Sequence, residues 1–151
     1  MAIIGVANLA VKVSDLDAAI RYYRRAGGQV SGPEPWRDGR RADVELGPLR
    51  ITLFTAALYE AQADLGDDAF LHVALFTDNL DHELEGHEPI WGPEVISGPS
   101  FGTRRVAFVT APGAMRLELM EQIEWAAVDH RVTGRTRGRP LRLAADRRRG
   151  P

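Results

Sequence analysis

One segment of this chain occurs twice in altered form, and the repeat restricts the folds that the chain can adopt. Residues 8–17 read NLAVKVSDLD, and residues 72–81, 64 positions later, read HVALFTDNLD. A second pair, RITLF at 50–54 and RLELM at 116–120, matches with an offset of 66. Because two separate segments agree in their order, we interpret the chain as a duplicated unit.

Each copy has the pattern of a β-α-β-β-β module. In the first copy, residues 6–13 alternate polar and apolar side chains, which is typical of a half-buried strand. A helix follows, with Ser14 as the expected N-cap and Gly27-Gly28 as its end. A strand is predicted from Gln29, and then a hairpin in which RADVEL and LRITLFT flank Gly47-Pro48.

The second copy repeats this order after a polar connection. Residues 70–77 predict a strand, and Leu80 and Leu84 mark a shorter helix that ends at Gly86. GPEVISG, TRRVAFVT and MRLELME are the remaining strands. We therefore expect an α+β fold in which two paired modules form one curved mixed sheet around a central cleft. The predicted boundaries are 4–56 and 70–123 for the modules and 57–69 for the connection.

Strand geometry separates two kinds of face, because side chains two residues apart point to the same side. In the repeated strands one face is aliphatic and should carry the helices. The other face mixes polar and apolar side chains and is expected to line the cleft. We predict His72 and Glu118 there as catalytic residues. The predicted substrate-binding residues on this face are Asn8, Lys12, Thr52, Phe54, Phe76 and Met120.

The paired modules resemble the vicinal oxygen chelate superfamily, which includes glyoxalase I, methylmalonyl-CoA epimerase and bleomycin-binding resistance proteins. The resemblance rests on VANLAVKVSDLDAAIRYY and FLHVALFTDNLD, which open the two modules. The segment GTRRVAFVTAPGAMRLELME is also similar to the last hairpin of epimerase- and glyoxalase-type members. The resemblance covers residues 4–123 and implies a small-molecule ligand and a homodimer.

For metal-dependent members, the resemblance implies ligands at four positions, which here hold Asn8, Thr52, His72 and Glu118. A catalytic divalent metal normally has three protein ligands. His72 and Glu118 supply two, and the amide and hydroxyl of the first module are weak donors. We therefore expect no firmly bound cofactor, with a divalent metal at His72 and Glu118 as an alternative.

Without a metal, a histidine and a carboxylate facing one pocket form an acid–base pair that can move a proton on carbon. Asn8 and Thr52 would then hold a substrate carbonyl or hydroxyl. The leading hypothesis is an enzyme for metal-independent isomerisation, elimination or cyclisation of a small carbonyl-containing metabolite. Eighteen Arg against one Lys suggest a high-GC genome, in which this fold often serves natural-product pathways.

Other functions stay open at this stage. A non-catalytic protein that sequesters an antibiotic, as bleomycin-binding relatives do, also fits the altered ligand positions. In that case His72 and Glu118 would only hydrogen-bond each other. A metal-dependent enzyme of the glyoxalase or epimerase type is the second alternative.

Two further groups of residues are candidates for ligand contact. Aromatic side chains in connections can close over a flat ligand or pack under the loops. These are Trp36, Tyr59, Trp91 and Phe101. Arg104 and Arg105 alternate across a strand, so only one can face the pocket, and we assign Arg105 to the substrate.

Composition narrows the class of protein. The chain has no Cys, which excludes disulfides and Cys-ligated zinc. No apolar run approaches the ~20 residues that cross a bilayer, and no signal segment follows Met1. We therefore expect a cytoplasmic protein that does not bind membranes.

The Arg-rich segment 126–151 differs in charge from the rest of the chain. It holds eight Arg and two Asp, a net charge of +6, whereas residues 1–125 carry −8. The segment has no apolar period, so we expect it to be mobile or docked on a partner chain. Nucleic-acid binding is not favoured, because no aromatic residues lie among the arginines.

Overall fold

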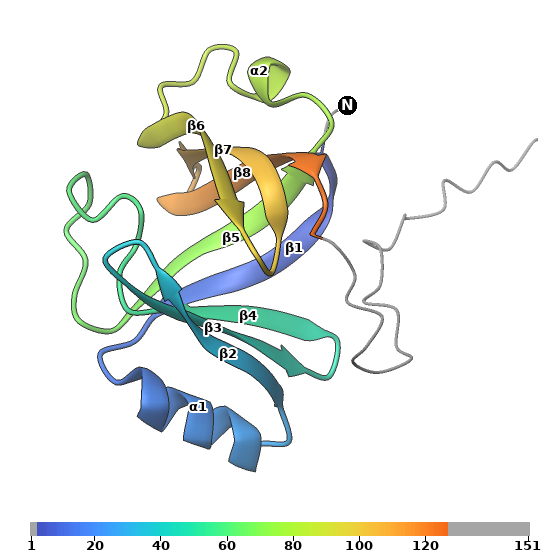
Figure 1. Cartoon of the computed structure of the whole chain (residues 1–151). Helices are drawn as coiled ribbons and strands as arrows, with labels where there is room; N and C mark the ends of the chain where they lie inside the picture. Colours follow the sequence, from blue (N-terminus) through green and yellow to red (C-terminus); the bar gives the residue numbers. More distant parts are fainter. Residues whose placement is uncertain (1–2, 127–151) are drawn as a thin grey trace, which may run out of the picture.

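The computed structural model describes residues 3–126 and shows two consecutive β-α-β-β-β units (Figure 1). The first unit consists of β1 (Ile3–Lys12), α1 (Leu16–Arg25), β2 (Gln29–Trp36), β3 (Gly39–Leu46) and β4 (Leu49–Phe54). The second consists of β5 (Ala69–Thr77), α2 (Leu80–Glu83), β6 (Trp91–Gly98), β7 (Gly102–Ala111) and β8 (Met115–Glu124). Apart from Ala126, the predicted Arg-rich segment lies outside the described residues.

All eight strands belong to one mixed sheet in the order β2-β3-β4-β1-β5-β8-β7-β6. The first strands of the two units, β1 and β5, pair antiparallel at its centre. Each also pairs in parallel with the last strand of its own unit, β1 with β4 and β5 with β8. The sheet is strongly curved, with α1 outside one half and α2 outside the other (Figure 1). The predicted fold class is therefore confirmed.

The duplication extends to the register of the strands. Ala10 of β1 pairs with Thr52 of β4, and in the second unit Ala74 of β5 pairs with Glu118 of β8. The second strands of the units also agree. Both contain Gly-Pro-Glu, and both shift register against the next strand at this point, between Ser31 and Glu34 in β2 and between Trp91 and Glu94 in β6.

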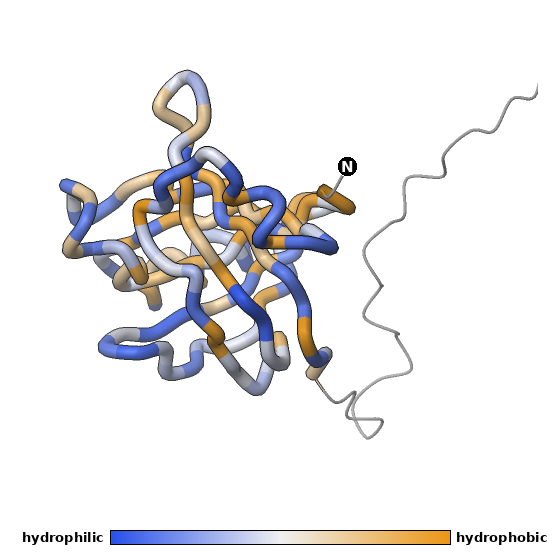
Figure 2. Tube along the Cα trace, turned by 90° about the horizontal axis from the view of Figure 1, so that it is seen from above, coloured by the Kyte–Doolittle hydropathy of each residue, from blue (hydrophilic) through white to orange (hydrophobic). Residues whose placement is uncertain are grey.

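The helices cover the aliphatic faces of the strands, as the alternation predicted. Leu16 and Ile20 of α1 pack in one cluster with Ile51 and Leu53 of β4. A smaller cluster joins Leu80, at the start of α2, to strands β7 and β8. Figure 2 shows hydrophobic and hydrophilic residues interspersed along the chain trace. Within residues 3–126, no helix is long and apolar enough to span a membrane.

The start of α1 corrects one sequence prediction. Asp15, not Ser14, is the N-cap, because its carboxylate accepts a hydrogen bond of 2.9 Å from the amide of Ala18. Ser14 instead donates its amide and its hydroxyl to the carboxylate of Asp68, at 3.0 and 2.9 Å. Ser14 therefore ties the end of β1 to the residue just before β5.

Candidate functional site

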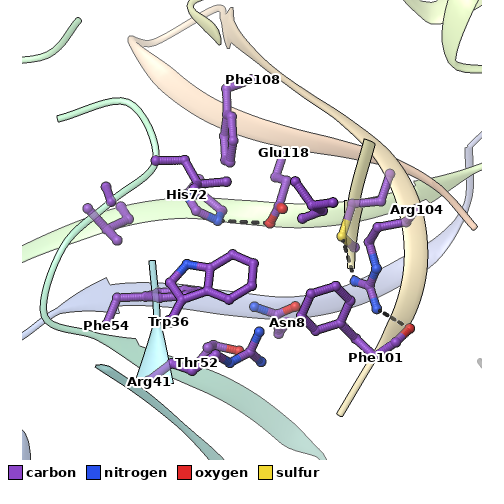
Figure 3. Close-up of a pocket in the computed structure, with 15 residues that line it drawn as sticks. Asn8, Trp36, Arg41, Thr52, Phe54, His72, Phe101, Arg104, Phe108 and Glu118 are labelled. Carbon is purple, nitrogen blue, oxygen red and sulfur yellow. Dashed lines mark hydrogen bonds and ion pairs between the residues drawn. The ribbon is translucent and has the colours of Figure 1, made fainter. Parts of the chain in front are cut away.

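A pocket of about 50 Å³ lies on the concave face of the sheet, where the two units meet (Figure 3). Strands from both units contribute its side chains. Its aromatic lining consists of Trp36, Phe54, Phe101 and Phe108. Its polar lining consists of Asn8, Arg41, Thr52, His72, Arg104 and Glu118.

Two alanines at the centre of the sheet leave space for this pocket. Asn8 pairs with Ala74, and Ala74 with Glu118, so these residues form a row across β1, β5 and β8. Neighbouring strands lie about 4.8 Å apart, so only the alanine methyl separates the two polar side chains. The equivalent row of the first unit is Thr52, Ala10 and His72.

His72 and Glu118 of the pocket lining form a hydrogen-bonded chain with the buried Tyr59. The hydroxyl of Tyr59 lies 2.9 Å from Nδ1 of His72, and Nε2 of His72 lies 3.0 Å from Oε2 of Glu118. The His72 side chain is 3% exposed and that of Glu118 is 12% exposed. Both imidazole nitrogens are thus occupied. In the described part of the chain, no group donates a hydrogen bond to Oε1 of Glu118.

Tyr59 keeps its proton in this chain of hydrogen bonds. Its side chain is completely buried and packs on Phe108, with ring centroids 4.7 Å apart. Burial raises the pKa of Tyr59 to about 12, although Arg116 opposes the shift. Because the carboxylate of Glu118 can only accept, it takes the proton of Nε2, and a singly protonated imidazole then accepts the phenol proton of Tyr59 at Nδ1.

Tyr59 comes from the loop between β4 and β5, and Lys12 helps to fix this loop. Oε1 of Glu60 accepts the amide proton of Ala57 at 2.9 Å and lies 3.0 Å from Nζ of Lys12. Lys12, which the sequence predicted as a substrate-binding residue, pairs with Glu60 and is absent from the residues that line the pocket.

The structure places Arg104 and Arg105 on opposite faces of the sheet. Arg104 lines the pocket, whereas Arg105 lies on the opposite face and pairs with Asp81 and Glu121, at 2.7 and 3.2 Å. The register of the β7–β8 hairpin explains the difference. Phe108 pairs with Glu118 across this hairpin, so residues an even number of positions from Phe108 share the face of Glu118.

Two predicted aromatic contacts lie beside the pocket and not in its lining. Phe76 packs against Trp125, with ring centroids 5.6 Å apart. Trp91 packs against Phe108 at 5.7 Å, behind the aromatic wall. The pocket does bring the other predicted ligand contacts together with His72 and Glu118. These are Asn8, Trp36, Thr52, Phe54, Phe101 and Met120.

Sequence reasoning did not identify Arg41 as a pocket residue. Its guanidinium donates two hydrogen bonds to the carboxylate of Asp43, at 2.9 and 3.0 Å, and Nε lies 3.5 Å from Glu34. The hydroxyl of Thr52 donates to the same Asp43 at 2.9 Å. The sequence did contain a signal for Arg41. The hairpin across Gly47-Pro48 sets Asp43 opposite Thr52, and Arg41 lies two residues before Asp43 on the same strand.

The donors in the pocket do not fit the divalent metal that the superfamily resemblance implies. Within residues 3–126, no three His, Cys, Asp or Glu side chains are grouped to hold a metal ion. His72 already binds Oε2 of Glu118, and Asn8 donates its amide to the carbonyl of Leu9 at 3.3 Å. Two guanidinium groups line the same pocket and would repel a cation.

No protein-family profile and no curated protein matches the chain. Several solved structures are similar. Methylmalonyl-CoA epimerase from Mycobacterium tuberculosis superimposes with a TM-score of 0.60 at 21% identity, covering 80% of this chain and 89% of the epimerase. A methylmalonyl-CoA epimerase in complex with methylmalonyl-CoA and NH4+ gives 0.60 at 20% identity, with 83% and 99% covered. A glyoxalase I variant from Zea mays gives 0.54 at 14% identity, with 83% and 45% covered.

These similarities define the class of protein at the level of its fold. The chain has the fold of the vicinal oxygen chelate superfamily, as the resemblance in its sequence predicted. At such low identities the activities of the similar proteins do not transfer to this chain, and function has to be argued from the site.

Proposed function

We propose that the protein is an enzyme that moves a proton on a small carbonyl compound without a metal, with Glu118 as the base. The observation that carries the proposal is the asymmetric environment of this carboxylate. Oε2 of Glu118 is held at 3.0 Å by His72, while Oε1 accepts no hydrogen bond within residues 3–126 and belongs to a residue that lines the pocket.

His72 and Tyr59 are positioning residues in this proposal. Because both nitrogens of His72 are hydrogen-bonded, the imidazole has no atom left to contact a substrate. It orients Glu118 and offsets its charge through the Nε2 proton. This modifies the sequence hypothesis, in which His72 and Glu118 both exchanged protons with the substrate.

The proposed step removes a proton from the carbon next to a carbonyl. Oε1 of Glu118 takes the proton, and the electron pair of the C–H bond moves into the carbonyl group, whose oxygen becomes negative. Asn8 donates one amide proton to Leu9 and has a second one for this oxygen. The carboxylic acid then returns the proton to another carbon or to a leaving oxygen.

The lining supports one-base chemistry. Among the described residues around the pocket, no Lys and no second Glu or His accompanies His72 and Glu118. Isomerisation by proton transfer along one face of the substrate, or elimination, needs a single base. Epimerisation by two opposed bases needs a second group, so we favour isomerisation or elimination.

Non-catalytic binding is the second candidate, and the aromatic lining favours it. Trp36, Phe54, Phe101 and Phe108 could hold a flat molecule without any reaction. The volume of about 50 Å³ argues against a large antibiotic, because pockets for drug-sized ligands usually measure about 300 Å³ or more. A compact ligand fits both candidate functions.

The test of this proposal is deuterium exchange. Small ketones and oxo acids are incubated with the protein in D2O, and NMR follows loss of the hydrogens next to the carbonyl. We expect exchange by the native protein and a loss of about a hundredfold or more in Glu118→Gln. Binding of a compound with no exchange, unchanged in Glu118→Gln, would instead support the binding protein.

We also infer that the protein is a homodimer, as the superfamily resemblance suggests. A groove beside the pocket is bordered by Ile4 and Trp125, whose side chains are 50% and 58% exposed. A second copy could cover these apolar groups. Light scattering coupled to size-exclusion chromatography tests this, and a monomer at micromolar concentration would contradict it.

A further inference from the structure

The two arginines of the pocket differ in their ionic partners. Arg41 is neutralised by Asp43 at 2.9 Å and Glu34 at 3.5 Å. Arg104 forms no ion pair with any carboxylate of residues 3–126. An unpaired charge that is partly removed from water is unfavourable, so such a group is usually found where a ligand supplies the counter-ion.

The hydrogen bonds of Arg104 are also incomplete. Nη2 donates to the carbonyl of Phe101 at 3.1 Å, and Nη1 contacts only the sulfur of Met120, at 3.0 Å (Figure 3). Thioether sulfur is a weak acceptor. Nε is buried without any partner. Burial lowers the pKa of Arg104 to about 10, although Glu118 opposes the shift, so the group remains a cation at neutral pH.

The position of the guanidinium is nevertheless well defined. It lies over the ring of Phe101, 4.5 Å from the centroid. The amide of Gln122 donates to the carbonyl of Phe101 at 2.7 Å, the same carbonyl that accepts from Arg104. A cation fixed in this way on a pocket wall, with donors unmatched, is suited to a planar anion.

We propose that Arg104 binds a carboxylate of the substrate, so that the substrate class is a short oxo acid. The inference rests on the proposed function for the identity of the reacting group, whereas the anion site stands on the geometry of Arg104 alone. One free guanidinium matches the single charge and flat shape of a carboxylate better than it matches the double charge of a phosphate dianion.

The distance to the base sets the size of this substrate. Met120, which touches Arg104, lies two residues from Glu118 on the same face of β8. Side chains two residues apart on a strand are separated by roughly 7 Å. A molecule with only a few bonds between its carboxylate and the carbon that loses the proton can therefore reach both groups.

Calorimetric binding of matched probe pairs tests the inference. The probes are benzoate with benzamide, and 4-oxopentanoate with its methyl ester. We expect each carboxylate to bind at least about tenfold more tightly than its neutral counterpart, and Arg104→Gln to lose about tenfold to a hundredfold in affinity for the carboxylate only. Arg105→Gln, which removes a charge from the other face of the same strand, should bind both carboxylates like the native protein.

Several outcomes would overturn the anion site. These are equal affinity for charged and neutral probes, native affinity in Arg104→Gln, absence of carboxylate binding at millimolar concentration, and tighter binding of inorganic phosphate. If Arg104→Gln does not fold, Arg104→Lys and the comparison of probes on the native protein decide the matter. Binding does not require proton transfer, so Glu118→Gln should retain the preference for carboxylates even if the proposed catalysis fails.

Discussion

The hydroxyl of Tyr59 lies 2.9 Å from Nδ1 of His72, on the side of the imidazole opposite to Glu118. In the tautomer with the His72 proton on Nε2, this proton points to Oε2 of Glu118, and Nδ1 accepts from Tyr59. Oε1, the other carboxylate oxygen of Glu118, accepts no hydrogen bond within residues 3–126. The orientation of Glu118, the base of the proposed reaction, thus depends on a residue from the loop between the two units.

The first prediction concerns the tautomer of His72. In mildly alkaline solution, 15N NMR should show a protonated Nε2 and an unprotonated Nδ1 for this ring. The His72→Gln variant assigns the signals among the four histidines of the chain. In Tyr59→Phe, Nδ1 loses its donor, and the rate of deuterium exchange should fall about tenfold. An Nδ1-protonated ring in the native protein would contradict this arrangement.

The second prediction follows from the raised pKa of Tyr59. Burial favours the protonated phenol and raises the pKa of Tyr59 in the folded state to about 12, compared with 10.0 for an ordinary tyrosine. The contribution of the buried phenol to the free energy of unfolding is fully present below pH 10 and is lost as the pH rises through 12. The loss is about 3 kcal/mol. Urea unfolding between pH 9 and 12 should show a steeper decline for the native protein than for Tyr59→Phe; equal slopes would contradict the prediction.

The sequence predicted the fold because the repeat carries information that single elements lack. The offset between copies placed His72 and Glu118 on one face, and these side chains do meet at 3.0 Å. Binary alternation sufficed along the parallel pairings of β1 with β4 and of β5 with β8, which have no register shift.

The positions of Tyr59, Lys12 and Arg104 depend on features beyond alternation. Tyr59 lies in a loop whose path is set by contacts of Glu60, and no periodicity encodes such a path. Lys12 lies an even number of residues from Asn8, so alternation puts both side chains on one face. However, the pairing of β1 with β5 shifts between Ala10 and Val11, and β1 ends at Lys12. A prediction that Arg104 faces the pocket requires the register of the β7–β8 hairpin as well as the two-residue period of the strand.

A third prediction concerns the alanine between Asn8 and Glu118. Ala74 is completely buried, so Ala74→Val adds two methyl groups between Asn8 and Glu118, two residues that line the pocket. We expect affinity for benzoate to fall about tenfold or more, with a loss of stability of about 1–3 kcal/mol from overpacking. Ala69→Val, at the partly exposed start of the same strand, is the control and should change neither quantity appreciably. Unchanged benzoate affinity in Ala74→Val would place the ligand elsewhere.

The last prediction uses the equivalence of the two units to test the metal question. Wild-type protein, purified without chelators and incubated with manganese, iron, nickel or zinc, should retain no stoichiometric metal by elemental mass spectrometry. The double variant Asn8→His, Thr52→Glu places in the first unit the residue types that the second unit has at equivalent positions. It should therefore bind metal more tightly than Asn8→His alone, because four ligands replace three. Near-stoichiometric metal in the wild type, lost in His72→Gln, would contradict metal-independent catalysis and restore a Lewis-acid mechanism.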